Sequence, residues 1–132
     1  MSDLLNKKCV ACEDKSIKPY GLEKAGELLI EVPGWALSED HNPPEHAEGG
    51  SLRARKISRE FQFKNFIEAI DFVSRSVADI AEVDGHHPDI HVFYNKVLLE
   101  LWTHSIGGLS ENDFIVASKI NQAYDNYKKF GI

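Results

Sequence analysis

The stretch from Glu82 to Asp113 constrains the fold of this chain most, because it joins two helical patterns through two alternating runs. It begins at the end of a helical pattern and continues with a His-His-Pro loop. Two runs of alternating apolar and polar residues follow, and then a new helical pattern begins. Two alternating runs around a short polar turn indicate an antiparallel hairpin. Residues 90–94 and 97–103 are therefore predicted strands, and Asn95-Lys96 is the predicted turn. A fold that accommodates this stretch places helices next to an antiparallel sheet.

Three helices and two further strands are predicted from the periodicity of apolar residues. Residues 22–32 suit a helix that Pro33-Gly34 ends, and residues 35–38 and 52–63 suit strands. The second helix begins at Asn65, and the last helix begins at Ser110. Their apolar stripes, which we expect in the core, are Phe66, Ile70, Val73, Val77 and Ile80, then Phe114, Ala117, Ile120, Tyr124 and Tyr127.

These elements predict an α+β fold. We expect a two-layer sandwich in which an antiparallel sheet of about four strands is covered on one face by three helices. The 132 residues suit one domain with a substantial core. Residues 1–18 are predicted to be a polar N-terminal arm, and residues 19–132 a single domain.

The composition favours a globular protein that binds neither nucleic acid nor membrane. Hydrophobic residues make up 42% of the chain and charged residues 27%, as in ordinary folded domains. A formal net charge of −6 disfavours a polyanion as partner. No apolar run is long enough to span a bilayer, and we expect no secretory signal. The densest basic cluster is predicted to be a solvated strand face and comprises Arg53, Arg55, Lys56 and Arg59.

Cys9 and Cys12, the two cysteines of the chain, form a Cys-x-x-Cys pair. One pair of cysteines cannot complete a four-ligand zinc site. A thioredoxin-like redox site would lie in a βαβ unit, and no βαβ pattern surrounds this pair. We interpret the pair as a feature of the N-terminal arm, with metal or redox use left open. This cysteine usage favours a cytoplasmic setting.

Three histidines are the candidate catalytic set. His86 and His87 are adjacent in a loop, and His104 follows the second hairpin strand. Imidazole titrates near neutral pH and therefore donates and accepts protons there. If the hairpin folds back on the loop, the carboxylates of Glu82 and Asp113 lie near the rings and orient them. The remaining histidines are predicted to lie on the surface and are His41, His46 and His91.

Three of these candidates also have a purely structural explanation. Asp113 lies three residues after Ser110 and would complete the N-terminal cap of the last helix. Glu82 would be an exposed carboxylate at a helix end, and His104 a hydrogen-bonded residue at a strand end. Zinc ligation by the histidines and a carboxylate is a sharper alternative, but adjacent side chains rarely point at one ion. The spacing favours proton transfer and leaves metal binding open.

Several short motifs have the spacing of one protein family. They are Glu82-x-x-x-His86-His87-Pro88, Tyr94-Asn95-Lys96-Val97, Thr103-His104, Gly108-Leu109-Ser110 and Asp113, preceded by Pro33-Gly34-Trp35 and Phe61-x-Phe63-x-x-Phe66. Together they resemble the pterin-4a-carbinolamine dehydratase family, over about Leu22 to Ala123. The cysteine pair and residues 40–50 lie outside the resemblance. Gly85 stands where some members carry an acid.

The resemblance implies a hydro-lyase that needs neither cofactor nor metal. The substrate would be a 4a-hydroxytetrahydropterin, formed when an aromatic amino-acid hydroxylase consumes its tetrahydropterin, and the product a quinonoid dihydropterin. His86 and His104 would act on protons, and His87 would position the pterin. The remaining site residues, for substrate binding or orientation, would be Glu82, Asp113 and Pro88.

The resemblance also implies an alternative function and a set of partners. The same fold serves as a protein-binding module that stabilises the dimer of a homeodomain transcription factor, and no residue here selects that alternative. Either function would use a homodimer or homotetramer. We expect a pterin substrate and a functional link to a hydroxylase, with no direct binding of nucleic acid or membrane.

Overall fold

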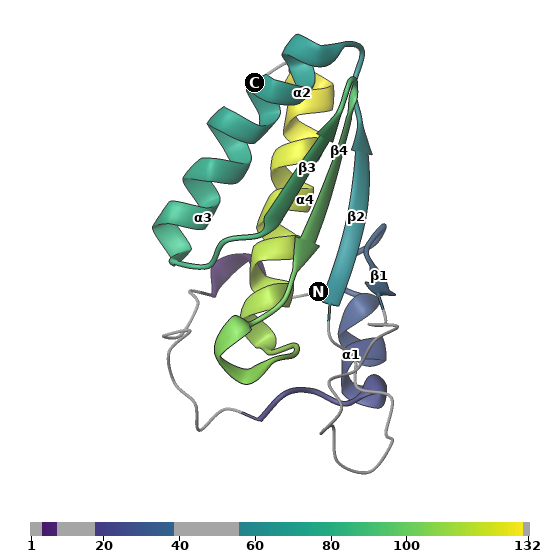
Figure 1. The fold of residues 1–132 in the computed structure, drawn as a ribbon, viewed down its shortest axis with the longest axis vertical. Coiled ribbons are helices and arrows are strands. Elements are labelled where there is room, and N and C mark those ends of the chain that lie inside the picture. Colours follow the sequence, from purple (N-terminus) through teal and green to yellow (C-terminus); the bar gives the residue numbers. More distant parts are fainter. Residues whose placement is uncertain (1–3, 8–17, 39–55, 131–132) are drawn as a thin grey trace.

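The computed structural model describes residues 4–7, 18–38 and 56–130 (Figure 1). Cys9, Cys12, His41 and His46 lie outside the described residues. The elements in chain order are η1 (Leu4–Asn6), α1 (Leu22–Leu29), β1 (Ala36–Ser38), β2 (Lys56–Gln62), α2 (Phe66–Phe72), the π-helix η3 (Val73–Val77), α3 (Ala78–Asp84), β3 (Asp89–Phe93), β4 (Lys96–Leu101), η4 (His104–Ile106) and α4 (Glu111–Phe130).

A four-stranded antiparallel sheet forms one layer of the molecule, and helices form the other (Figure 1). The spatial order of the strands is β1-β2-β4-β3, so the hairpin of β3 and β4 lies beside β2 and leaves β3 at an edge. Alternate residues Val97, Leu99 and Leu101 of β4 point to the helices and are fully buried. The predicted α+β sandwich, with an antiparallel sheet and three helical units, is confirmed.

The hairpin turn is formed by Tyr94 and Asn95, one residue earlier than predicted. Phe93 pairs with Lys96, which leaves two residues between the strands. Tyr94 adopts a left-handed backbone conformation with φ of 53°. The carbonyl of Asn95 accepts a hydrogen bond of 2.8 Å from the backbone N–H of Phe63, and its side-chain amide donates to the Phe63 carbonyl at 3.1 Å. These two bonds hold Asn95 in the turn and explain the shift.

The α2–η3–α3 helix begins at the predicted cap. The side chain of Asn65 accepts from the backbone N–H of Glu68 at 2.9 Å, and the Glu68 carboxylate accepts from the N–H of Lys64. The predicted core stripe is only partly correct. Phe66 and Ile70 are 49% and 41% exposed, whereas Val77 is fully buried.

The buried side of this helix is rotated relative to the predicted stripe. Besides Val77, its buried apolar residues are Ala69, Phe72 and Ala81. The π-helix η3 inserts a wider turn between α2 and α3, so one spacing of three and four cannot describe the whole face. Small alanines allow close packing here, and larger apolar residues flank them on the surface. Periodicity found the helix and the core contacts of Val73, Val77 and Ile80, but it misplaced the buried side of α2.

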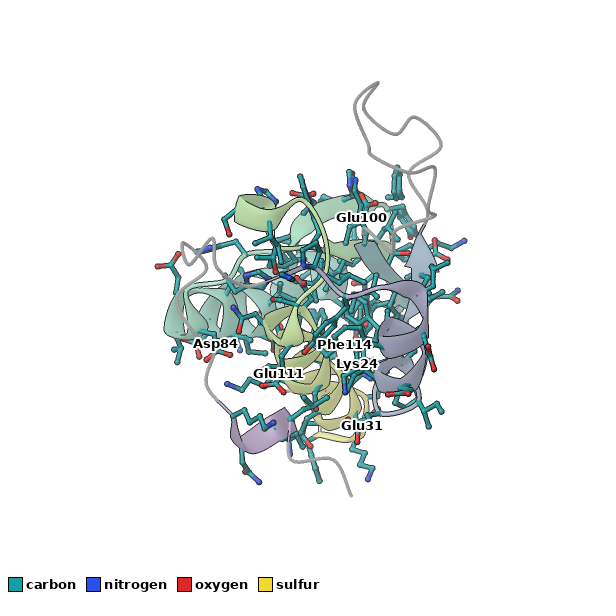
Figure 2. The ribbon with its side chains drawn as sticks, turned by 90° about the horizontal axis from the view of Figure 1, so that it is seen from below. Lys24, Glu31, Asp84, Glu100, Glu111 and Phe114 are labelled. Carbon is teal, nitrogen blue, oxygen red and sulfur yellow. The ribbon has the colours of Figure 1, made fainter. Side chains whose placement is uncertain are left out.

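Helix α4 packs its N-terminal half in the core. Its buried residues include Phe114, Ala117 and Ile120 of the predicted stripe, and Tyr124 and Tyr127 lie half-buried against the same core. Within the described residues, no helix has both the length and the apolar character needed to cross a membrane. Figure 2 shows Phe114 at the centre of the packed side chains.

Arg59 departs from the predicted solvated strand face. It lies half-buried on the helix side of β2, with its guanidinium carbon 4.6 Å from the centre of the Phe61 ring. Its Nη1 donates to the Pro33 carbonyl at 3.2 Å and to Asn121 Oδ1 at 2.6 Å. A Cβ atom on Gly34, whose φ is +90°, would lie 2.6 Å from Arg59 Nε, so this approach needs glycine. Arg59 therefore ties the end of the α1 segment to α4.

Part of the predicted N-terminal arm packs on the domain. Leu4, in η1, is buried in the main core, and the ammonium of Lys7 lies 3.0 Å from the Glu111 carboxylate. Helix α1 ends at Leu29, earlier than predicted, and successive tight turns lead to Pro33-Gly34. The division into residues 1–18 and 19–132 stays a prediction.

Candidate active site

Three segments that carry candidate residues meet at one end of the sheet. Figure 1 shows the loop after α3, the end of β4 and the start of α4 at the same end of the molecule. Gly85, with φ of 66°, ends α3 in a left-handed conformation. Glycine adopts this conformation without steric cost, so the chain turns sharply and delivers His86 toward α4.

The centre of the site is a buried pair of His86 and Asp113. Nε2 of His86 lies 2.7 Å from Oδ1 of Asp113, and the two residues are 4% and 0% exposed. An ionised carboxylate only accepts hydrogen bonds, so Nε2 carries the proton and the ring is held in one tautomer. The lone pair of the neutral ring is then on Nδ1. Asp113 therefore orients a group capable of proton transfer.

Two further groups bind the Asp113 carboxylate. The hydroxyl of Thr103 donates to Oδ2 at 2.9 Å, and the backbone N–H of Ser110 donates to the same oxygen at 2.9 Å. The Ser110 hydroxyl lies 2.8 Å from Thr103 Oγ1 and donates to it, since the Thr103 proton is already used. These bonds compensate for burying the carboxylate. They also connect the residue before His104 to the carboxylate that holds His86.

His87 and Glu82 form a second, exposed pair. Nε2 of His87 lies 3.0 Å from Oε1 of Glu82, and both side chains are largely exposed to solvent. The contact connects the last turns of α3 to the loop that follows. An exposed pair of this kind contributes little to stability, so it orients the His87 ring without fixing it rigidly.

His104 is exposed and packs on Trp102. The ring centres are 4.0 Å apart with an angle of 35° between the planes. The indole N–H of Trp102 donates to Oδ2 of Asp89 at 3.2 Å. Since Asp89 follows Pro88 directly, the end of β4 is tied to the histidine loop here as well as through Asp113. Pro88 is buried between these two connections.

A partly buried ion pair fixes the base of the histidine loop. The Lys119 ammonium lies 2.9 and 2.6 Å from the two carboxylate oxygens of Asp84, the last residue of α3. The Asp84 side chain is 2% exposed and that of Lys119 is 23% exposed. Figure 2 labels Asp84 at the end of α3, beside the first half of α4. This pair holds α3 against α4 two residues before His86.

Tyr20 packs next to the Asp113 network. Its backbone N–H donates to the Leu109 carbonyl at 2.8 Å, and its ring centre is 6.2 Å from that of Phe114. Burial raises the pKa of Tyr20 above its ordinary value, and the nearby Glu111 carboxylate raises this pKa further. The phenol therefore stays protonated at neutral pH.

The structure places the predicted residues in two linked groups. His86 lies with Asp113, and His87 lies with Glu82; the two histidines are adjacent in sequence and so link the groups. His104 joins them through its neighbours and not through a side-chain contact of its own with a histidine. His91 is exposed, as predicted, and lies 2.8 Å from Glu100. Within the described part of the chain, no three His, Cys, Asp or Glu residues are arranged to hold a metal ion.

Some residues of this network received no function from the sequence. Ser110 was predicted only as a helix cap and Thr103 only as a motif member, and Trp102, Asp89 and Lys119 received no function. The alternation of the second hairpin strand placed Trp102 and His104 on one face, a signal that could have found their contact. No local signal connects Asp84 with Lys119, which are 35 residues apart.

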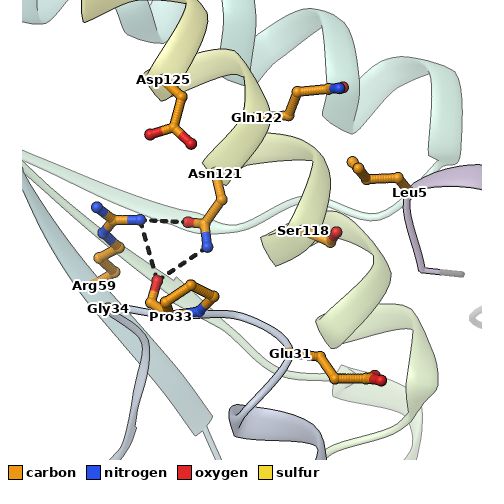
Figure 3. Close-up of a pocket in the computed structure, with 9 residues that line it drawn as sticks. All are labelled: Leu5, Glu31, Pro33, Gly34, Arg59, Ser118, Asn121, Gln122 and Asp125. Carbon is orange, nitrogen blue, oxygen red and sulfur yellow. Dashed lines mark hydrogen bonds between the residues drawn. The ribbon is translucent and has the colours of Figure 1, made fainter. Parts of the chain in front are cut away.

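Two cavities lie away from the histidines. One, of about 480 Å³, is bordered by Arg59, Asn121 and the Pro33-Gly34 turn, and Figure 3 shows the hydrogen bonds among them. The other, of about 650 Å³, lies beside Phe63 and Tyr127. None of the three candidate histidines borders either cavity.

Comparison with known proteins identifies the family. The profile described as pterin 4 alpha carbinolamine dehydratase matches residues 18–123, which is most of the chain. The chain belongs to this family. Dehydratases of this kind are hydro-lyases, so the comparison confirms the predicted family and enzyme class.

Individual relatives agree with this assignment. The chain is 45% identical over 123 residues to pterin-4-alpha-carbinolamine dehydratase 2, mitochondrial, of Arabidopsis thaliana, and the match covers 92% of this chain and 59% of that protein. The chain therefore spans about three fifths of the length of that relative. A protein from Halorhodospira halophila that carries the same enzyme name provisionally is 40% identical, with 89% of this chain and 94% of the relative covered.

A solved structure has the same fold. The crystal structure of a transcriptional coactivator/pterin dehydratase from Brucella melitensis matches with a TM-score of 0.66 and 30% identity. The match covers 81% of this chain and 99% of that one. The fold is therefore that of a pterin dehydratase.

Proposed function

We propose that this chain dehydrates a 4a-hydroxytetrahydropterin, such as 4a-hydroxytetrahydrobiopterin, to the quinonoid dihydropterin and water by histidine acid–base catalysis. The observation that carries the proposal is the buried His86–Asp113 pair, 2.7 Å apart, which joins the loop after α3 to the start of α4. Family membership supplies the substrate class. The pair supplies an oriented imidazole.

The reaction requires two proton transfers and no electron acceptor. An acid protonates the 4a-hydroxyl, the C4a–O bond breaks, and water leaves. The N5 lone pair forms the C4a=N5 double bond, and a base removes the N5 proton. One imidazolium and one neutral imidazole supply these groups at neutral pH.

We assign proton transfer to His86 and His104, and pterin binding to His87. Asp113 supports the assignment of His86, because its hydrogen bond to Nε2 fixes the tautomer and the orientation of the ring. His104 is exposed beside the Trp102 ring, where a ligand from solvent can meet it. Glu82 orients His87, and buried Pro88 fixes the path of the loop.

We further propose that the chain works as a homodimer or homotetramer. Apolar residues Phe66, Ile67 and Ile70 are exposed along α2, and Ile90 and Phe93 are exposed on the edge strand β3. Exposed apolar side chains on a helix and at a sheet edge favour burial against another copy. A link to an aromatic amino-acid hydroxylase and a cytoplasmic setting remain predictions from the sequence.

The proposal is tested by generating the 4a-carbinolamine in the assay and following its loss by absorbance. The wild-type protein should accelerate the loss above the spontaneous rate, and the acceleration should survive treatment with a chelator. Loss of activity on chelation, restored by stoichiometric zinc, would favour the metal alternative. No acceleration by folded protein would reject the dehydratase.

A protein-binding module is the second candidate function. The name of the Brucella protein joins coactivator and pterin dehydratase, which is the observation that favours this candidate. Such a module would serve as a dimerisation cofactor of a transcription factor. A folded oligomer that leaves the spontaneous dehydration rate unchanged would favour it over the enzyme.

A further inference from the structure

Trp102 occupies a position that the three-histidine account leaves unexplained. It lies one residue beyond β4, on the sheet face opposite the helices, and is only half-buried. Glu100, labelled in Figure 2, shares this face by strand alternation. A tryptophan on this face contributes less to the core than one beneath the helices. Core packing therefore does not explain Trp102, and its contacts with Asp89 and His104 suggest another function.

We propose that Trp102, held by Asp89, is a positioning residue that fixes the ring of His104 relative to the histidine loop. The expected effect of Trp102 on the dehydration rate rests on the function proposed above. Its effect on the orientation of the His104 ring does not, because that orientation belongs to the free protein.

The first contact is with the histidine loop. The Trp102 indole N–H donates to Asp89 Oδ2 at 3.2 Å, and Asp89 follows Pro88 directly. A charged acceptor strengthens a hydrogen bond of this kind. The Lys56 ammonium lies 5.7 Å from the centre of the Trp102 ring, on the neighbouring strand, and adds a cation–π contact. The indole plane is thus restrained from two sides.

The second contact is with His104. The ring centres lie 4.0 Å apart, close enough for an offset aromatic contact. His104 is exposed, and an exposed side chain without such a contact would exchange among rotamers. The backbone of His104 is already fixed, because Thr103 is buried and bonded to Asp113. The indole therefore restricts the remaining freedom, that of the side chain.

The expected effect is pre-organisation. Proton transfer depends on the position of the donor within a fraction of an ångström, and a displacement of about 1 Å costs as much as 100-fold in rate. The contacts from Asp89 through Trp102 to His104 fix the His104 ring relative to the loop that carries His86 and His87. Removing the indole should lower kcat more than it raises KM.

The test combines NMR of the His104 ring with steady-state kinetics. In the wild type, the indole ring current should displace the His104 ring protons from their usual shifts, with the signals assigned by His104→Gln. Trp102→Leu should return them toward ordinary values and lower kcat roughly 10- to 100-fold. Asp89→Ala should shift both readouts in the same direction, and Asp89→Asn, which keeps an acceptor oxygen, should restore them in part.

Leu98→Ala is the matched control. Leu98 lies on the same sheet face, four residues before Trp102, and should leave both readouts unchanged. If the His104 shifts are unchanged in Trp102→Leu, Trp102 does not orient the His104 ring. If the shifts change but kcat stays at the wild-type value, this orientation does not contribute to catalysis. If Trp102→Leu fails to fold, Trp102→Phe and the two Asp89 variants test whether Trp102 positions His104. Should the wild type lack dehydratase activity, the proposed function fails, and the NMR measurements alone decide whether Trp102 positions His104.

Discussion

Asp113 both caps a helix and binds a histidine. The sequence presented these as alternatives, because an acid three residues after Ser110 completes a cap. In the structure, one carboxylate oxygen accepts from the Ser110 N–H and the other from His86. The two functions use different oxygens, so spacing alone could not choose between them. The start of α4 is thereby built into the candidate site.

Asp113→Asn tests the orientation of His86. The amide oxygen can still accept from Thr103 and the Ser110 N–H, but its NH2 group would face His86 Nε2 and select the other tautomer. We expect kcat to fall roughly 10- to 100-fold, as when other carboxylates that orient histidines are altered. Steady-state dehydration kinetics measure this.

Glu111→Gln is the control for Asp113→Asn. Glu111 also lies in the first turn of α4, but it pairs with exposed Lys7. The Glu111→Gln variant should therefore retain wild-type turnover. Equal losses in both variants would indicate a general effect on the helix N-terminus and contradict a specific function of Asp113.

Glu82→Gln should have a much smaller effect than Asp113→Asn. Both side chains of the Glu82–His87 pair are largely exposed, where ion pairs contribute about 0–1 kcal/mol. We therefore expect at most a few-fold change in kcat/KM, with KM affected first if His87 binds the pterin. A loss as large as that of Asp113→Asn would contradict the smaller contribution that we expect from the exposed pair.

At the scale of elements, the contact between α3 and α4 positions the histidine loop. Lys119 and Asp84 join these helices directly before Gly85 and His86. Sequence patterns located both helices correctly, because their caps and periodicity are local. They could not pair the two residues, because a contact between distant helices leaves no local pattern. They also misplaced the buried face of α2, where Phe66 and Ile70 are exposed.

Lys119→Met should destabilise the protein. It leaves the Asp84 carboxylate buried without its partner, which costs about 3 kcal/mol. Unfolding in urea should therefore shift to lower denaturant concentration. The double variant Asp84→Asn with Lys119→Met should recover much of the loss, since the unpaired charge is removed. Additive losses in the double variant would show that the pair has no special coupling.

At the scale of the whole molecule, sequence alone predicted the fold class, the strands and the helices well. The antiparallel hairpin and the three amphipathic segments left few arrangements with one buried sheet face. The order β1-β2-β4-β3 needed the structure, since strand periodicity does not specify neighbours. The sequence named the candidate site residues, but it did not indicate the hydrogen bonds of Thr103 and Trp102 that connect their segments.

The exposed apolar residues of α2 predict self-association. Ile67→Glu combined with Ile70→Glu should reduce the mass of the wild-type oligomer, measured by light scattering after gel filtration, because buried charges oppose an apolar interface. Ile30→Glu is the control, since Ile30 is strongly exposed directly after α1 and not on α2. A wild-type protein that is monomeric at micromolar concentration would contradict the prediction.

The most direct test of the account is a double-mutant cycle of His86→Ala and His104→Ala, measured as the rate of 4a-carbinolamine loss above the spontaneous rate. We predict that each single variant slows the reaction roughly 100-fold, and that the double variant is little slower than the slower single, because the two rings serve one reaction. Wild-type rates in both single variants would contradict the account.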